Sequence, residues 1–194
     1  AELTQVMRSS GALSDLTMYM RDCVKNEEDP NIKPDNKQIF LLEDDGFMDR
    51  IDSLFGMDWE LNTARVLTYT NKQAQAYNQY IRELRKQESV FCEGDFVIVN
   101  EFCRGFATDS EIRLSDETGI INREYGLEYK FFRMGEKGLA VPLDYEAFHH
   151  KVKQFKDEKD WINYFGIKEF FVDLRDPYAM TTHKAQGSTY QHSL

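Results

Sequence analysis

The sequence predicts an α/β fold with a mostly parallel sheet, interrupted by a small β-rich insert. Over residues 1–87, three segments with helical spacing of apolar residues alternate with two short β-forming runs. Between residues 91 and 143, short strands follow one another with turn signals, which indicates a small β-barrel or an SH3-like insert. Such alternation, broken and then resumed, is typical of a parallel sheet layered with helices and carrying an insertion.

The first helix is predicted over residues 9–25, where Leu13 and Leu16 begin an apolar stripe and Ser9 or Ser10 can cap the start. A polar loop with two prolines follows. The run "QIFLLE", residues 38–43, is short and apolar, and we expect it to form a buried strand.

A short helix is then expected to open near Asp45. The segment "RVLTYT", residues 65–70, is rich in β-formers and predicts a second strand. Thr70 or Asn71 can cap the helix that comes next.

The β-rich insert is predicted from three signals. "GDFVIVNE" is a strand opened by a Gly-Asp turn, and residues 111–124 are expected to form a hairpin about the Asp-Glu-Thr-Gly turn. Residues 127–143 predict a second hairpin about "MGEKG". Two helical segments follow, "DYEAFHHKVKQF" and "DEKDWINYFG".

The apolar run "EFFVDL" then leads to the C-terminal segment. We therefore expect one split α/β domain, residues 1–90 and 166–194, and an insert over residues 91–165 that adds a helical segment to its β-rich part.

Composition narrows the classes of function. The chain has 194 residues with 41% hydrophobic content, enough for a real core. No apolar run approaches the ~20 residues needed to cross a bilayer, so no membrane partner is expected. His149 and His150 are adjacent, but no Cys or His lies at ligand spacing from them, so we expect surface residues and no metal site.

Charge is distributed unevenly. The net charge is −10, which argues against a general polyanion-binding surface. Residues 64–87 nevertheless carry a net charge of +4, between segments of −8 and −6. A basic island of this kind permits a local phosphate contact without requiring one.

The segment "YAMTTHKAQGSTY", residues 178–190, is crowded with hydrogen-bonding side chains. Ala179 to Thr181 are predicted to end a strand, and a turn or helix is expected to start at Lys184. Ligands gather at the carboxyl ends of parallel strands, and a helix start offers backbone N–H groups to an anion. The alternative is a polar loop with an incidental glycine.

The string T-x-H-K-x-Q-G-S over residues 181–188 resembles motif V of superfamily 1 helicases, in the RecD/Dda-like branch that moves 5′ to 3′ on DNA. The resemblance implies that Thr181 and His183 face single-stranded DNA, with Lys184 alongside. It places three further residues toward an ATP cleft: Gln186, Gly187 and Ser188. Thr189 departs from the pattern, since the family often has a glutamate there that contacts the ribose.

Two other segments extend the resemblance. "ELTQVMRSS" resembles the family's motif IV region, which implies that Arg8 is the catalytic arginine directed at the γ-phosphate. "VLTYTNKQAQAYNQYIR" resembles a strand and helix whose start, here Thr70 and Asn71, meets the DNA backbone. Ordinary helix capping is the alternative for both residues, and the two roles are compatible.

The resemblance implies a second RecA-like motor domain interrupted by an SH3-like insert. The chain contains no G-x-x-x-x-G-K-[ST] phosphate-binding loop, and the family's motif VI would follow residue 194. ATP and Mg²⁺ would thus be held mostly by a first motor domain, with none bound tightly here, and this polypeptide alone is expected neither to hydrolyse ATP nor to unwind DNA. The implied partners are single-stranded DNA, that N-terminal motor domain, and replication or repair proteins, in a bacterial or phage-infected cytoplasm.

Two other classes of function remain open. One is a stand-alone module on the β-rich insert that binds single-stranded nucleic acid or protein. The other is an unrelated α/β enzyme of nucleotide metabolism that uses the Thr/His/Lys loop. For Trp161, Tyr164 and Phe165, packing against the α/β domain is favoured over stacking on DNA.

Overall fold

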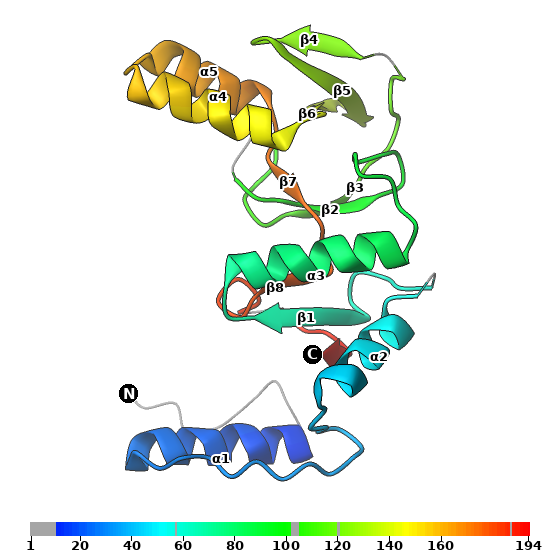
Figure 1. The fold of residues 1–194 in the computed structure, drawn as a ribbon, viewed down its shortest axis with the longest axis vertical. Helices are drawn as coiled ribbons and strands as arrows, with labels where there is room; N and C mark the ends of the chain where they lie inside the picture. Colours follow the sequence, from blue (N-terminus) through cyan, green and yellow to red (C-terminus); the bar gives the residue numbers. More distant parts are fainter. Residues whose placement is uncertain (1–10, 57, 102–104, 120, 187) are drawn as a thin grey trace. The chain divides into compact units, whose positions relative to one another are not determined.

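A computed structural model describes residues 11–194 apart from 57, 102–104, 120 and 187 (Figure 1). The chain divides into two compact units, residues 1–49 and 50–194. Within the described ranges, helices and strands make a mixed α/β fold. None of the helices in those ranges combines the length and the apolar character that a membrane crossing requires.

The first unit contains helix α1 (Ala12–Asn26), which confirms the first predicted helix. Its N-cap is Gly11, with φ of 66° and no side-chain hydrogen bond to the helix. A side chain at Gly11 would be strained in that left-handed conformation, and its Cβ would lie 3.2 Å from Oε1 of Gln38. The two expected caps, Ser9 and Ser10, lie outside the described residues.

The prediction of a buried strand over residues 38–43 is wrong. Oδ1 of Asp35 accepts hydrogen bonds from the backbone N–H groups of residues 37, 38 and 39, at 2.8–2.9 Å. The carbonyl of Ile39 in turn accepts from the N–H groups of residues 35 and 36. This local loop uses the donors that a strand would offer, and Leu41 is left 61% exposed.

Helix α2 (Asp44–Leu54) begins in the first unit and ends in the second, and it confirms the helix expected near Asp45. In the second unit, Ile51 and Phe55 are fully buried. Phe55 stacks on Trp59, and the Trp59 ring lies 4.8 Å from the ring of Tyr178. This aromatic group joins the residues that follow α2 to Tyr178, far along the chain.

The parallel sheet of the second unit has the order β8-β1-β9, from β1 (Ala64–Thr68), β8 (Ala179–Thr181) and β9 (His192–Ser193). Both neighbours run parallel to β1. Helix α3 (Asn71–Leu84) follows β1 and contacts β1 and β8. The predicted second strand, the helix after it, and a parallel sheet are thus confirmed.

The β-rich region forms two antiparallel sheets. The first has the order β3-β2-β7, from β2 (Phe96–Val99), β3 (Glu111–Arg113) and β7 (Leu174–Arg175). The second has the order β4-β5-β6, from β4 (Asn122–Glu124), β5 (Leu127–Met134) and β6 (Lys137–Pro142). The predicted β5–β6 hairpin is confirmed, and Gly135 supplies the positive φ, 62°, at its turn.

The hairpin predicted over residues 111–124 is wrong, because β3 pairs with β2 whereas β4 pairs with β5. The intervening residues run beside β5 instead of reversing the chain. Thr118 N donates to the carbonyl of Phe131, and Arg133 N donates to the carbonyl of Asp116. The Asp-Glu-Thr-Gly segment therefore carries the chain from one sheet to the other. In the described residues these sheets remain open, with no closed barrel.

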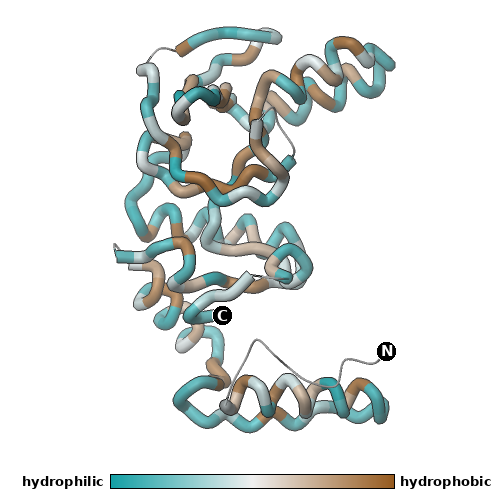
Figure 2. The backbone as a smooth tube through the Cα atoms, turned by 180° about the vertical axis from the view of Figure 1, so that it is seen from behind, coloured by the Kyte–Doolittle hydropathy of each residue, from teal (hydrophilic) through white to brown (hydrophobic). Residues whose placement is uncertain are grey.

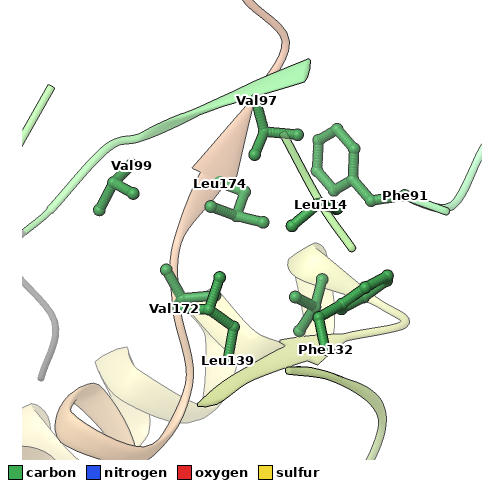
Figure 3. Close-up of a cluster of buried hydrophobic side chains, with 9 residues drawn as sticks. Phe91, Val97, Val99, Leu114, Phe132, Leu139, Val172 and Leu174 are labelled. Atoms are coloured by element: carbon green, nitrogen blue, oxygen red, sulfur yellow. The ribbon is translucent and has the colours of Figure 1, made fainter. Parts of the chain in front are cut away.

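The two sheets enclose an apolar core, drawn in Figure 3. Val97 and Val99 of β2 face Phe132 and Leu139 of the other sheet. Val172 and Leu174 arrive from beyond the helical segment and complete this core. In Figure 2, β2 is a hydrophobic stretch of this unit. Because β7 pairs with β2, the chain rejoins the parallel sheet only at β8.

The two helices expected after the β-rich region are confirmed as α4 (Tyr145–Asp157) and α5 (Trp161–Phe170). Asp144 and Asp160 cap them, each accepting from a backbone N–H three residues on. The helices pack together on β6 through a buried cluster: Ala140, Phe148, Phe155, Ile167 and Phe171. Aspartate caps and helical spacing of apolar residues account for both helices.

Candidate nucleic-acid interface

The carboxyl ends of β1 and β8 lie side by side. Thr68 pairs with Thr181 in parallel register, and the N–H of Thr182 donates to the carbonyl of Thr68 at 2.9 Å. After β1 the chain enters α3 through Thr70 and Asn71, and after β8 it enters the turn at residues 182–186. The fold therefore brings the two distant segments with predicted DNA contacts to one edge of the sheet.

The start of α3 is held by a capping box. Oγ1 of Thr70 accepts from the backbone N–H of Gln73 at 3.2 Å, and Oε1 of Gln73 accepts from the N–H of Thr70 at 3.3 Å. Helix capping by Thr70 is thus confirmed, while its DNA contact stays a prediction. Thr70 and Asn71 are both exposed at the positive end of the helix dipole, where an anion is favoured.

The predicted turn after β8 is also confirmed. The N–H groups of Lys184 and Ala185 donate to the carbonyl of Thr181, at 2.9 and 3.1 Å. His183 is exposed, whereas Lys184 is half-buried. Nζ of Lys184 donates to Oδ1 of Asn100 at 3.1 Å, so the turn is tied to the end of β2. The sequence did not indicate this contact between Lys184 and Asn100.

Of the residues expected at an ATP cleft, Gln186 and Ser188 are exposed on the same turn. Gly187 and the predicted catalytic Arg8 lie outside the described residues. Two exposed side chains by themselves form no cradle for a triphosphate. Among described residues, no group of three or more His, Cys, Asp or Glu is placed to hold a metal ion.

Asn78 positions the two halves of the candidate site, and sequence reasoning missed it. This buried residue of α3 donates from Nδ2 to the carbonyl of Ala179 at 3.0 Å and accepts at Oδ1 from the N–H of Ala179 at 2.7 Å. The amide therefore pairs with the free edge of β8 as a neighbouring strand would. A signal was present: Asn78 lies on the apolar stripe of the helix, between Ala74 and Ile81.

A groove of about 900 Å³ runs along α3 from Asn71 to Arg82. Thr181 and Lys184 line it at the Asn71 end, whereas His183 does not line it. The opposite wall is made by α4 and by residues 173–176. The groove thus collects three of the five predicted DNA-binding residues.

Carboxylates outnumber the Arg and Lys side chains in this groove. Three cations line it: Arg82, Arg175 and Lys184. Five carboxylates line it as well: Glu83, Glu101, Glu146, Asp173 and Asp176. The interior therefore disfavours a polyanion. A phosphodiester is best accommodated at the strand ends, where Asn71, Thr181 and Lys184 supply neutral or cationic donors.

Arg82 closes the far end of the groove. Its guanidinium bonds Asp176 at 2.7 Å and Asp95 at 2.8 Å, and it also donates to the carbonyls of Glu88 and Val90. The paired carboxylates outweigh burial and raise the pKa of Arg82. Burial raises the pKa of Asp176 to about 6, against the pull of Arg82. This network joins α3 to the entry and the exit of the β-rich region.

The aromatic residues of α5 have different environments. Tyr164 is half-buried and packs on the cluster between α4 and α5. The packing expected for Trp161 and Phe165 is wrong, because these side chains are 50% and 59% exposed. Helix α5 carries apolar residues on several faces, and one face alone reaches α4 and β6. His149 and His150 lie at the surface, as expected.

No protein-family model matches the chain, and no curated protein matches it. The residues at the ends of β1 and β8, and the groove beside them, are the features of this chain that point to a function.

Proposed function

We propose that this chain belongs to the second, RecA-like motor domain of a superfamily 1 DNA helicase of the RecD/Dda-like branch, with an SH3-like insert. One observation carries the proposal. The T-x-H-K turn and the Thr70–Asn71 helix start come from distant parts of the sequence and meet at one sheet edge. That edge is where parallel sheets bind ligands.

The chemistry of this edge suits a phosphodiester backbone. The capped start of α3 presents the positive end of a helix dipole, and Thr181 and Lys184 add a hydroxyl and an ammonium group. Contacts of this kind ignore base identity, as a motor that moves along any sequence requires. In this proposal, ATP and Mg²⁺ bind chiefly to the other motor domain, and Gln186 and Ser188 face the nucleotide from this side.

A direct test measures binding of a fluorescent oligo-deoxythymidine to the whole chain by anisotropy. Lys184→Met should weaken binding severalfold and flatten the dependence of log K on log salt by about 0.7, because one phosphate contact is lost. Lys153→Met, an exposed lysine on α4, removes the same charge away from the site and is the control. Equal losses from the two variants would remove the support for this interface.

A second test asks whether the polypeptide alone turns over ATP. Phosphate release measured with malachite green, with and without single-stranded DNA, should stay at the blank value. Turnover above the blank that survives repurification and is lost in a Gln186→Ala variant would contradict the proposed division of labour between two motor domains.

The rival proposal is an autonomous binding module on the β-rich insert, and the intact chain tests it better than an isolated fragment does. An isolated 91–143 fragment would lack Val172 and Leu174, which complete the core of that region. The intact chain with Lys184→Met is therefore the better reagent. A binding module confined to the insert predicts that this variant binds the oligonucleotide as tightly as the unmodified chain.

A further inference from the structure

Two cations from different segments converge on one carboxylate beside the T-x-H-K turn. Nη2 of Arg175, in β7, lies 2.6 Å from Oδ1 of Asp109. Nζ of Lys184 lies 3.6 Å from the same oxygen. Arg175 and Lys184 both line the groove at α3, so the carboxylate neutralises two of its cations.

The backbone around Asp109 holds this carboxylate in place. Its φ is 62°, a left-handed conformation that Asp and Asn tolerate better than most residues. The N–H of Asp109 donates to the carbonyl of Val99 at 2.7 Å, and the N–H of Val99 donates to the carbonyl of Ser110 at 3.0 Å. The loop is thus tied to the end of β2, while the Asp109 side chain remains 47% exposed.

An amide and a second carboxylate lie beside the two cations. Asn100 joins the group, since it accepts from Lys184 and donates from Nδ2 to Asp173 at 2.9 Å. Burial lowers the pKa of Arg175, and the nearby carboxylates of Asp109 and Asp173 oppose that effect. Nε of Arg175 is enclosed and has no hydrogen-bond partner among the described residues. The contact with Asp109 is therefore made through Nη2, and an anion that replaces the carboxylate would bind the same group.

We propose that Asp109 is an internal competitor for the DNA backbone: its carboxylate occupies the place of a phosphate between Arg175 and Lys184, and a phosphodiester displaces it. This inference rests on the proposed function, and it adds Arg175 as a DNA-binding residue. Carboxylate and phosphate are both oxyanions that accept charge-assisted hydrogen bonds from a guanidinium, so one can replace the other. The exposed Asp109 side chain can turn away into solvent when it is displaced.

The competitor also links the DNA site to the β-rich region. Asp109 belongs to the loop between β2 and β3, Arg175 to β7, and Lys184 to the turn after β8. Without DNA, the ion pairs tie that turn to the β2 sheet. With DNA bound, they are exchanged for phosphate contacts, and the turn is released from the loop.

The test compares oligo-deoxythymidine binding by the intact chain with that of Asp109→Asn. The variant keeps the shape and the tolerance for positive φ but loses the charge. Binding should tighten about three- to fivefold, the size expected for an exposed ion pair. The slope of log K against log salt should steepen by about 0.7, because the net positive charge of the site rises by one.

Asp116→Asn is the matched control. Asp116 also has a positive φ, 51°, is exposed and lies in the β-rich region. Its replacement changes the net charge by the same amount away from Arg175. Combining Asp109→Asn with Arg175→Gln should abolish the gain, and Arg175→Gln should weaken binding more in the Asp109→Asn background than in the unmodified chain. Thermal melting of each variant checks that it folds.

The outcomes separate the two proposals. If the unmodified chain binds and Asp109→Asn matches Asp116→Asn, the competitor is refuted and the helicase proposal stands. If neither the unmodified chain nor Asp109→Asn binds, both proposals fail. Binding that is detectable only with Asp109→Asn supports the competitor, with the carboxylate closing the site completely.

Discussion

The two ends of α3 use polar side chains for different purposes. At its C-terminal end, Arg82 is buried and bonded to Asp95, Asp176 and two carbonyls. At its N-terminal end, Thr70 and Asn71 are exposed beside the ends of β1 and β8. The C-terminal end uses its polar groups to hold the β-rich region. The N-terminal end keeps Thr70 and Asn71 exposed, where a ligand can reach them. Binding sites need the second arrangement, and a rigid scaffold needs the first.

Breaking the buried end should have the largest effect. Arg82→Met leaves Asp95 and Asp176 without their shared cation in a poorly hydrated place, so the free energy of unfolding should fall by about 3–5 kcal/mol. Urea denaturation followed by circular dichroism measures this. Arg123→Met, an exposed position on β4, should change it by less than about 0.5 kcal/mol. A loss at Arg82 no larger than that would show that the network contributes little.

The second-largest loss of stability is expected in the middle of α3. Asn78→Ala removes both hydrogen bonds to Ala179 and leaves a buried N–H and C=O without partners, so we expect a loss of about 2–3 kcal/mol. Hydrogen exchange at the Ala179 amide should accelerate more than exchange elsewhere in the sheet. The exposed Gln79→Ala is the control. Unchanged protection at Ala179 would contradict the role given to Asn78.

The stability that the network at the C-terminal end of α3 provides should also depend on pH. The pKa of Asp176 is raised from 3.8 to about 6, so the folded state holds this proton more tightly than the unfolded state. Its contribution to stability is complete below about pH 3.8 and is lost as the pH rises through about 6. As the pH rises across this range, urea unfolding should show the unmodified chain losing stability relative to Asp176→Asn. Parallel curves for the two proteins would contradict the shifted pKa.

The exposed end should respond least in stability. Thr70→Ala removes the cap and should cost about 1 kcal/mol, whereas Thr70→Ser should restore most of it. If this end serves DNA, the alanine variant should also bind oligo-deoxythymidine about twofold more weakly, since the dipole end is less well ordered. Loss of stability without any change in binding would limit Thr70 to capping.

Local signals were enough for several elements of the fold. Gly135 predicted the β5–β6 turn, the aspartates at 144 and 160 stand at the starts of α4 and α5, and the β-formers of residues 65–70 became β1. Each of these features depends on a few neighbouring residues. Within the candidate site, the capped start of α3 and the turn after β8 were predicted for the same reason.

Partners distant in sequence account for what was missed. The exception is residues 38–43, which looked like a strand: the nearby Asp35 accepts hydrogen bonds from the backbone N–H groups of residues 38 and 39. Arg65 in β1 is fully buried and bonds Glu111 of β3 at 2.7 Å, although its own neighbours give no hint of an ion pair. Asp109 and Arg175 likewise carry no local signal of their contact with each other.

The sequence by itself determined α1, α2, β1, α3 and β8, because caps, turns and hydrophobic spacing act over a few residues. It also supplied the T-x-H-K-x-Q-G-S string and its resemblance. Only the tertiary structure decided that β3 and β4 belong to different sheets, that Asn78 holds the edge of β8, and that Asp109 faces two cations. Those contacts depend on which strand ends meet, and strand pairing is a property of the whole chain.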